Sequence, residues 1–351
     1  MIILCIKITM QRISILSSAA SLKRRQYRAV GLAMMLLAAA LLFSRMLAAS
    51  LARRLYQSYP YNPYNSMIIS AFFSILVQIG VCFLLVFLVY KFTLKMNSKE
   101  IFAFSNFNRT KWYNLALAVP IGIVGIFVTI GISTVWAIFL GVLGYNRPRY
   151  SAALPATFSP GLFILQIFLI AVLPAICEEF AIRGGLFTVL RNKYRGGMFF
   201  VIMAVAFGLF HQNITQLAYT AFFGAIMAFV VFKTKSVYPA MIIHFVNNAL
   251  SVYLTHARAY GWFMGNIFGS WILEIHIFNL FFGYIAIVAI FIALLVLLAY
   301  VNKIQATENV RPYQPAKTQK ISLKDNFFFI GAIIITAVFT LYTLILGLSL
   351  G

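Results

Sequence analysis

Acidic residues are the scarcest chemical class in this sequence. The 351 residues include 6 Asp and Glu against 28 Lys and Arg, and 63% of the chain is hydrophobic while 10% is charged. So little charge excludes a water-soluble globular protein and indicates a polytopic membrane protein. The formal charge of +22 would suggest a nucleic-acid partner in a soluble chain, but basic loops on the cytoplasmic side of a membrane account for it better.

Cysteine and internal repeats are also in short supply. The three cysteines, Cys5, Cys82 and Cys177, are odd in number and lie mostly in apolar sequence, so no disulfide framework is expected. Cys177 is expected to pack rather than to act as a nucleophile. No repeat divides the chain into similar halves, which counts against the architecture common among transporters.

Long apolar runs, in contrast, are abundant. A helix that crosses a bilayer needs about 20 mostly apolar residues. Nine runs approach or exceed this length: 29–50, 67–90, 114–143, 162–190, 198–214, 216–232, 237–254, 277–300 and 326–349. The predicted fold is therefore all-α, a polytopic transmembrane helix bundle with eight or nine spans.

The basic residues predict how these spans are oriented. With a cytoplasmic N-terminus and nine spans, 21 of the 28 Lys and Arg fall in cytoplasmic segments, five fall outside, and Arg45 and Arg183 lie within apolar runs. This asymmetry predicts that the N-terminus is cytoplasmic. We expect a multi-pass protein of the cell membrane, in a bacterial plasma membrane, whose surroundings are the lipid bilayer and which has no nucleic-acid partner.

Four regions follow from the pattern of runs and loops. They are a cytoplasmic basic N-terminal segment at 1–28, N-terminal transmembrane helices at 29–158, a core at 159–255, and C-terminal transmembrane helices at 256–351 that contain a cytoplasmic loop at 301–325.

Two of the six acids lie where acids are most costly. Glu178 and Glu179 stand side by side within the run 162–190, where each charge costs on the order of 3 kcal/mol. Arg183 follows Glu179 by four residues, so these two share a helix face and can form a salt bridge that locks the helix. Glu178 lies about 100° around the helix and needs another polar partner. Pro174, one turn earlier, is expected to kink this span.

The remaining ionisable residues of interest lie outside the apolar runs. Asp325 falls in a polar loop and is expected to be solvated, and His256 is expected at the surface beyond the membrane core.

Two further spans supply partners for the glutamates. Phe207 and His211 are four residues apart in one span, and His244 and Asn248 have the same spacing in another, so each pair shares a helix face. A lone histidine in an apolar helix usually just packs, but two of four histidines here accompany two of six acids. At about 1.5 Å per residue, Glu178, His211 and His244 lie roughly 12 to 20 Å from the cytoplasmic ends of their spans. We therefore expect them to converge.

These motifs, in this order on separate apolar spans, resemble the CPBP intramembrane protease family. That family includes the type II CAAX prenyl endopeptidases and bacterial proteins linked to bacteriocin processing, also called Abi proteins. The motifs are EEFAIR from Glu178 to Arg183, FxxxH from Phe207 to His211, and HxxxN from His244 to Asn248. The resemblance covers roughly residues 160–255 and makes the region 159–255 a catalytic core.

The resemblance implies that Glu178, His211, His244 and Asn248 are catalytic. A carboxylate among apolar helices suits a general base that takes a proton from water. His211 would orient that water or pass the proton to the leaving amine, and His244 and Asn248 would donate hydrogen bonds to the oxyanion. Glu179, held by Arg183, would keep Glu178 facing the cavity, with Phe207 in support.

A metal ion is the open question about cofactors. Glu178, His211 and His244 are also a ligand set for zinc, with a position left for water. The sequence has no HExxH motif, and a metal-independent mechanism is favoured over a zinc site.

The predicted function is therefore an intramembrane endopeptidase. It would hydrolyse a peptide bond of a membrane-associated peptide or small membrane protein with glutamate-activated water. Two alternatives stay open: a transporter or channel that uses the Glu/His cluster as a proton or cation relay, and a non-catalytic membrane regulator.

Overall fold

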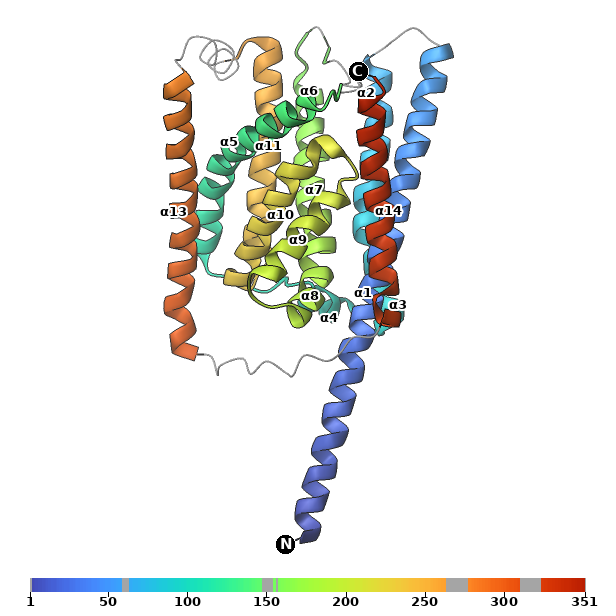
Figure 1. Cartoon of the computed structure of the whole chain (residues 1–351), viewed down its shortest axis with the longest axis vertical. Helices are drawn as coiled ribbons and strands as arrows, with labels where there is room; N and C mark the ends of the chain where they lie inside the picture. Colours follow the sequence, from blue (N-terminus) through green and yellow to red (C-terminus); the bar gives the residue numbers. More distant parts are fainter. Residues whose placement is uncertain are drawn as a thin grey trace.

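The computed structural model describes residues 2–58, 63–146, 154–155, 157–262, 277–309 and 323–350. Its elements in these ranges are all helices (Figure 1), which confirms the all-α prediction. They are α1 (Ile2–Ser58), α2 (Pro63–Ile75), η1 (Leu76–Leu85), α3 (Val86–Leu94), α4 (Ser98–Phe104), α5 (Trp112–Val142), α6 (Pro160–Gln166), η2 (Ile167–Val172), α7 (Leu173–Glu179), η3 (Phe180–Leu186), α8 (Phe187–Lys193), α9 (Gly196–Phe210), α10 (Ile214–Thr234), α11 (Tyr238–Tyr260), α13 (Ile277–Asn309) and α14 (Leu323–Leu348). The three η segments are π-helical.

All nine predicted runs coincide with helices, and seven helical stretches among the described residues are long and apolar enough to cross a membrane. These are Ser21–Arg54, Met67–Leu94, Trp112–Val142, Pro160–Lys193, Ile214–Thr234, Phe282–Lys303 and Lys324–Leu348. The other two, α9 and α11, fall short for different reasons. The 15 residues of α9 extend only about 22 Å, less than the roughly 30 Å of the hydrocarbon core. The polar residues of α11 lower its hydropathy.

The helices alternate in direction across the bundle, and the chain ends at opposite faces (Figure 1). The N-terminus lies beyond the end of the bundle that carries α3, α4 and α8, and the C-terminus lies at the other end. The basic segments 91–111 and 191–195 belong to the N-terminal face, as the predicted orientation requires. The helix pairs in closest contact are α9 with α10, α1 with α14, and α5 with α11.

The fourth span is irregular around its glutamates. π-Helical η2 precedes α7 and π-helical η3 follows it, and such insertions are frequent at functional sites. A kink lies at Gly184, which has non-helical angles (φ −77°, ψ −109°); Pro174, where the sequence predicted one, lies in the first turn of α7, directly after π-helical η2. A Cβ added at Gly184 would lie 2.8 Å from Cβ of Ser105, and one at Gly185 would collide with the Tyr90 hydroxyl. The two glycines therefore let the span approach α3 and the end of α4.

Two expectations about polar residues were wrong. Asp325 is not solvated: its side chain is 1% exposed and accepts from the guanidinium groups of Arg24 (2.7 Å) and Arg28 (2.5 Å). Its burial follows from the packing of α14 against α1, whose basic residues lie about 300 positions away in sequence. His256 is not at the surface either: it is 2% exposed, and its Nδ1 bonds to the carbonyl of Val252.

The predicted cytoplasmic loop at 301–325 is helical at both ends. Helix α13 continues to Asn309 and α14 begins at Leu323, and the middle of this loop lies outside the described residues. Likewise, the basic segment at 1–28 has no boundary of its own, because α1 runs without a break from Ile2 to Ser58.

Candidate active site

A polar cavity of about 420 Å³ lies between the spans. Side chains from α2, η1, η2, α7, α9, α10 and α11 enclose it. They are Ser74, Gln78, Leu169, Ile170, Pro174, Glu178, Phe207, His211, Gln216, Tyr219, Thr220, Phe223, His244, Asn247, Asn248 and Ser251. The four residues predicted to be catalytic, together with Phe207, thus line one cavity, while Glu179 and Arg183 lie behind its wall.

Glu178 is buried and faces this cavity. Its Oε1 accepts a hydrogen bond from Nε2 of Gln78 at 2.8 Å, and both side chains are buried. Its Oε2 has no hydrogen-bond partner among the described residues. The carboxylate is therefore held by one oxygen, and its other oxygen is buried with its capacity to accept hydrogen bonds unused.

Glu179 has a different environment from its neighbour. It is fully buried, and its Oε1 accepts from Nη1 of Arg183 at 2.9 Å and from Nδ1 of His244 at 2.8 Å. The predicted pair with Arg183 is confirmed, but the bond to His244 was not anticipated. The Arg183 guanidinium also lies 3.9 Å from the centre of the Phe207 ring, a distance that suits a cation–π interaction. Glu179 thus joins α7 to α11.

The hydrogen bonds of the two histidines determine their tautomers. Nδ1 of His211 lies 2.9 Å from the Phe207 carbonyl oxygen, and Nδ1 of His244 lies 2.8 Å from the Glu179 carboxylate. Both partners only accept, so each Nδ1 carries a hydrogen and donates it. In the neutral ring, Nε2 is then the nitrogen with a lone pair. His211 itself lies in the turn after α9, and not within a span as predicted.

The two neighbouring asparagines of α11 differ in their bonds. Nδ2 of Asn248 donates to the Ile170 carbonyl at 2.9 Å. This bond ties α11 to π-helical η2, one turn before Pro174. Nδ2 of Asn247 is buried in the cavity wall without a hydrogen-bond partner among the described residues. Asn247 is thus a candidate that the HxxxN pattern does not include.

Helix α1 holds the turn that carries His211. Nη2 of Arg45 donates to the His211 carbonyl at 2.7 Å, and Nε2 of Gln212 donates to the Ala38 carbonyl at 2.9 Å. Gln212 has a positive φ of 46°, a backbone conformation uncommon for residues with a Cβ. The sequence indicated no role for Arg45 beyond its position in an apolar run.

Glu178, His211 and His244 are the ligands that a zinc site would use. Within the described ranges, no three His, Cys, Asp or Glu side chains are grouped so that they could hold a metal ion. We therefore derive no step through a metal.

The fold and the cavity define a multi-pass membrane protein with an ionisable site enclosed between its spans. Residues 160–250 match the family described as type II CAAX prenyl endopeptidase, Rce1-like. The resemblance inferred from the three motifs is confirmed over this segment, which contains all four predicted catalytic residues. Neither a curated protein nor a solved structure matches the chain. The match supports a membrane peptidase of the CAAX protease type.

Proposed function

We propose that this protein is an intramembrane endopeptidase in which Glu178 activates a water molecule. One observation carries the proposal: Glu178, His211 and His244 line one cavity between the spans, and a Glu178 oxygen has no partner among the described residues. A polar cavity between membrane spans can admit both water and an extended peptide. An acid buried between membrane spans costs free energy, so its presence there indicates a functional site.

Glu178 acts as the general base. It removes a proton from the bound water, and the resulting hydroxide attacks the carbonyl carbon of the scissile peptide bond. Gln78 donates to Oε1 and so holds the carboxylate in place. When the C–N bond breaks, the proton goes to the leaving amine.

His244 and Asn247 stabilise the oxyanion that forms on the carbonyl oxygen. Glu179 accepts from Nδ1 of His244 and so fixes the orientation of the ring; Nε2 donates to the oxyanion when it carries a hydrogen. The amide of Asn247 supplies a second donor. Asn248 contributes its other amide hydrogen and keeps η2 in register through Ile170.

His211 serves the proton transfers. Because its Nδ1 donates to the Phe207 carbonyl, Nε2 of the neutral ring can accept a hydrogen bond from water or carry the proton from Glu178 to the amine. Arg45 holds this residue from the backbone side.

The substrate is a peptide or small protein that reaches the site from the bilayer of a bacterial plasma membrane. The family name that residues 160–250 match points to prenylated C-termini as the first class to test. A farnesylated peptide reporter and the small membrane proteins of the host cell are two suitable substrate sets.

The deciding experiment compares wild type with Glu178→Gln in proteoliposomes and in cell membranes. We expect the variant to fold and insert but to lose cleavage of the reporter, and an uncut peptide to accumulate in its membranes. Glu100→Gln is the matched control, because Glu100 is exposed on the short helix α4. Cleavage retained by Glu178→Gln would disprove the assignment of the base. Proton flux that needs Glu178 and occurs without any cleavage would favour the relay alternative.

A further inference from the structure

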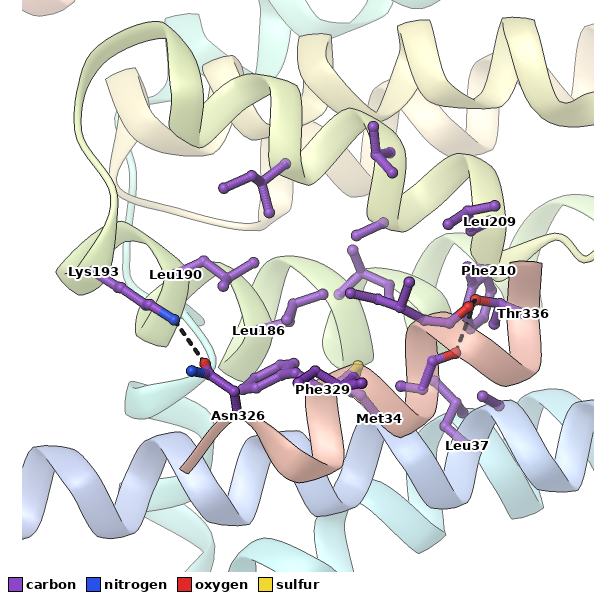
Figure 2. Close-up of a pocket in the computed structure, with 18 of the residues that line it drawn as sticks. Met34, Leu37, Leu186, Leu190, Lys193, Leu209, Phe210, Asn326, Phe329 and Thr336 are labelled. Carbon is purple, nitrogen blue, oxygen red and sulfur yellow. Dashed lines mark hydrogen bonds between the residues drawn. The ribbon is translucent and has the colours of Figure 1, made fainter. Parts of the chain in front are cut away.

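A second cavity, of about 470 Å³, lies between α1, α8, α9 and α14 (Figure 2). Nearly all of its walls are aliphatic or aromatic. Its lining includes Met34, Leu37, Leu186, Leu190, Leu209 and Phe329. Such a lining offers no groups for peptide-bond chemistry and suits a hydrocarbon chain.

This cavity is separate from the active site. The two cavities have no lining residue in common. The rings of Phe207 and Phe210 stack between them at 6.1 Å with 7° between their planes, and each ring lines a different cavity. A molecule in the second cavity therefore does not touch Glu178.

The second cavity opens sideways toward the lipid. Three of its lining residues are largely exposed on the outside of the bundle: Val201 at 57%, Val205 at 51% and Ile333 at 55%. They lie on α9 and α14, so the opening is between these two helices. A chain from the surrounding bilayer can enter without crossing water.

One end of the cavity is polar and positively charged. Nζ of Lys193 lies 2.8 Å from both the Tyr27 hydroxyl and Oδ1 of Asn326, as Figure 2 shows for Lys193 and Asn326. These partners are neutral, and no carboxylate of the described residues forms an ion pair with Lys193. The nearby Asp325 pairs with two arginines, so this end of the bundle keeps an excess of positive charge.

The length of the cavity matches one leaflet. Its lining on α14 extends from Asn326 at the charged end to Thr336 at the far end, a distance of about 15 Å along the helix. This is half of the roughly 30 Å hydrocarbon core. By the predicted orientation, Lys193 lies at the cytoplasmic surface.

We propose that this cavity binds one acyl chain of an anionic phospholipid whose phosphate pairs with Lys193. The apolar walls take the chain, and the opening between α9 and α14 admits it. The Lys193 ammonium, which forms no ion pair with a described residue, selects a negative headgroup. Basic pockets between spans on the cytoplasmic side are suited to such headgroups. Because Ile182 lines the cavity next to Arg183, the lipid also supports the helix turn behind Glu179.

The test uses the full chain, purified in detergent micelles containing either phosphatidylglycerol or phosphatidylcholine with palmitoyl and oleoyl chains. Native mass spectrometry counts the lipid that stays bound. We expect the wild type to retain one phosphatidylglycerol, about fivefold more tightly than phosphatidylcholine, as one lysine near a lipid headgroup predicts. Lys193→Gln removes this preference, and Lys193→Arg keeps it.

A second variant fills the cavity instead of changing its charge. Ala332→Phe on α14 should block the chain and abolish retention of both lipids. Ile334→Phe, on the same helix but 55% exposed and outside the lining, is its control, and exposed Lys91→Gln is the control for charge.

Three outcomes would overturn the proposal. They are equal retention of the two lipids by wild type, retention unchanged in Ala332→Phe, and release of the lipid by a farnesylated peptide, which would assign the cavity to a substrate tail. Because binding is measured without cleavage, the result does not depend on whether Glu178 is the base.

Discussion

Replacing Gln78 with leucine tests whether the activity of Glu178 requires a hydrogen bond from a residue far outside the matched segment. The change keeps a side chain of similar size and removes the 2.8 Å bond from Nε2 to Oε1. Hydrogen bonds to charged groups contribute about 1.5 to 3 kcal/mol. The other oxygen has no partner among the described residues, so no alternative donor is in place. If the loss falls on the transition state, kcat/KM decreases about 10- to 150-fold.

The assay is cleavage of the farnesylated reporter in proteoliposomes, with kcat and KM determined separately and insertion checked by thermal unfolding. Ser74→Ala is the matched control, since Ser74 lines the same cavity but donates to the Leu169 carbonyl. Its kcat/KM should decrease by less than a few-fold. Wild-type kcat/KM in Gln78→Leu, or an equal loss in Ser74→Ala, would refute the reasoning.

Further variants separate effects on catalysis from effects on stability. Asn247→Ala should lower kcat about 100- to 1,000-fold, the usual loss for one oxyanion donor. Asn248→Ala removes a secondary donor and the bond to η2, so it should lower kcat less and should also lower the unfolding temperature. Kinetics and melting of both variants check this, and a larger loss of kcat in Asn248→Ala would remove Asn247 from the site. Arg183→Met leaves Glu179 buried without its cation and should cost about 3 to 5 kcal/mol. The double change Arg183→Met and Glu179→Gln should cost less than the sum of the two single changes in the same melting assay, and additive losses would contradict the coupling.

The sequence predicted the parts of the site that depend on local spacing. The salt bridge between Glu179 and Arg183 follows from four residues on one helix, and the edge-to-face contact of Phe207 with His211 follows from the same spacing. The convergence of Glu178, His211 and His244 followed from their depths in the membrane. These inferences need only helix geometry and the cost of burying charge.

The contacts between distant segments could not be predicted in this way. Gln78 is a lone amide in an apolar run, 100 residues from Glu178, and no pattern relates the two. The choice between Asn247 and Asn248 was also hidden, because both lie on the His244 face of α11. Asp325 looked like a loop residue because its arginine partners are on α1, at the other end of the sequence.

The hydrogen bonds from α1 and η1 to the site have a practical consequence for truncating this protein or grafting its motifs. A fragment limited to residues 160–250 would carry every letter of the three motifs. It would lack Gln78, which steadies the base, and Arg45, which fastens the His211 turn. Such a fragment, or a graft of the motifs onto another bundle, would therefore keep the reactive groups and lose the contacts that orient them. The smallest fragment that could retain an oriented site therefore begins before Arg45, well before the matched segment 160–250.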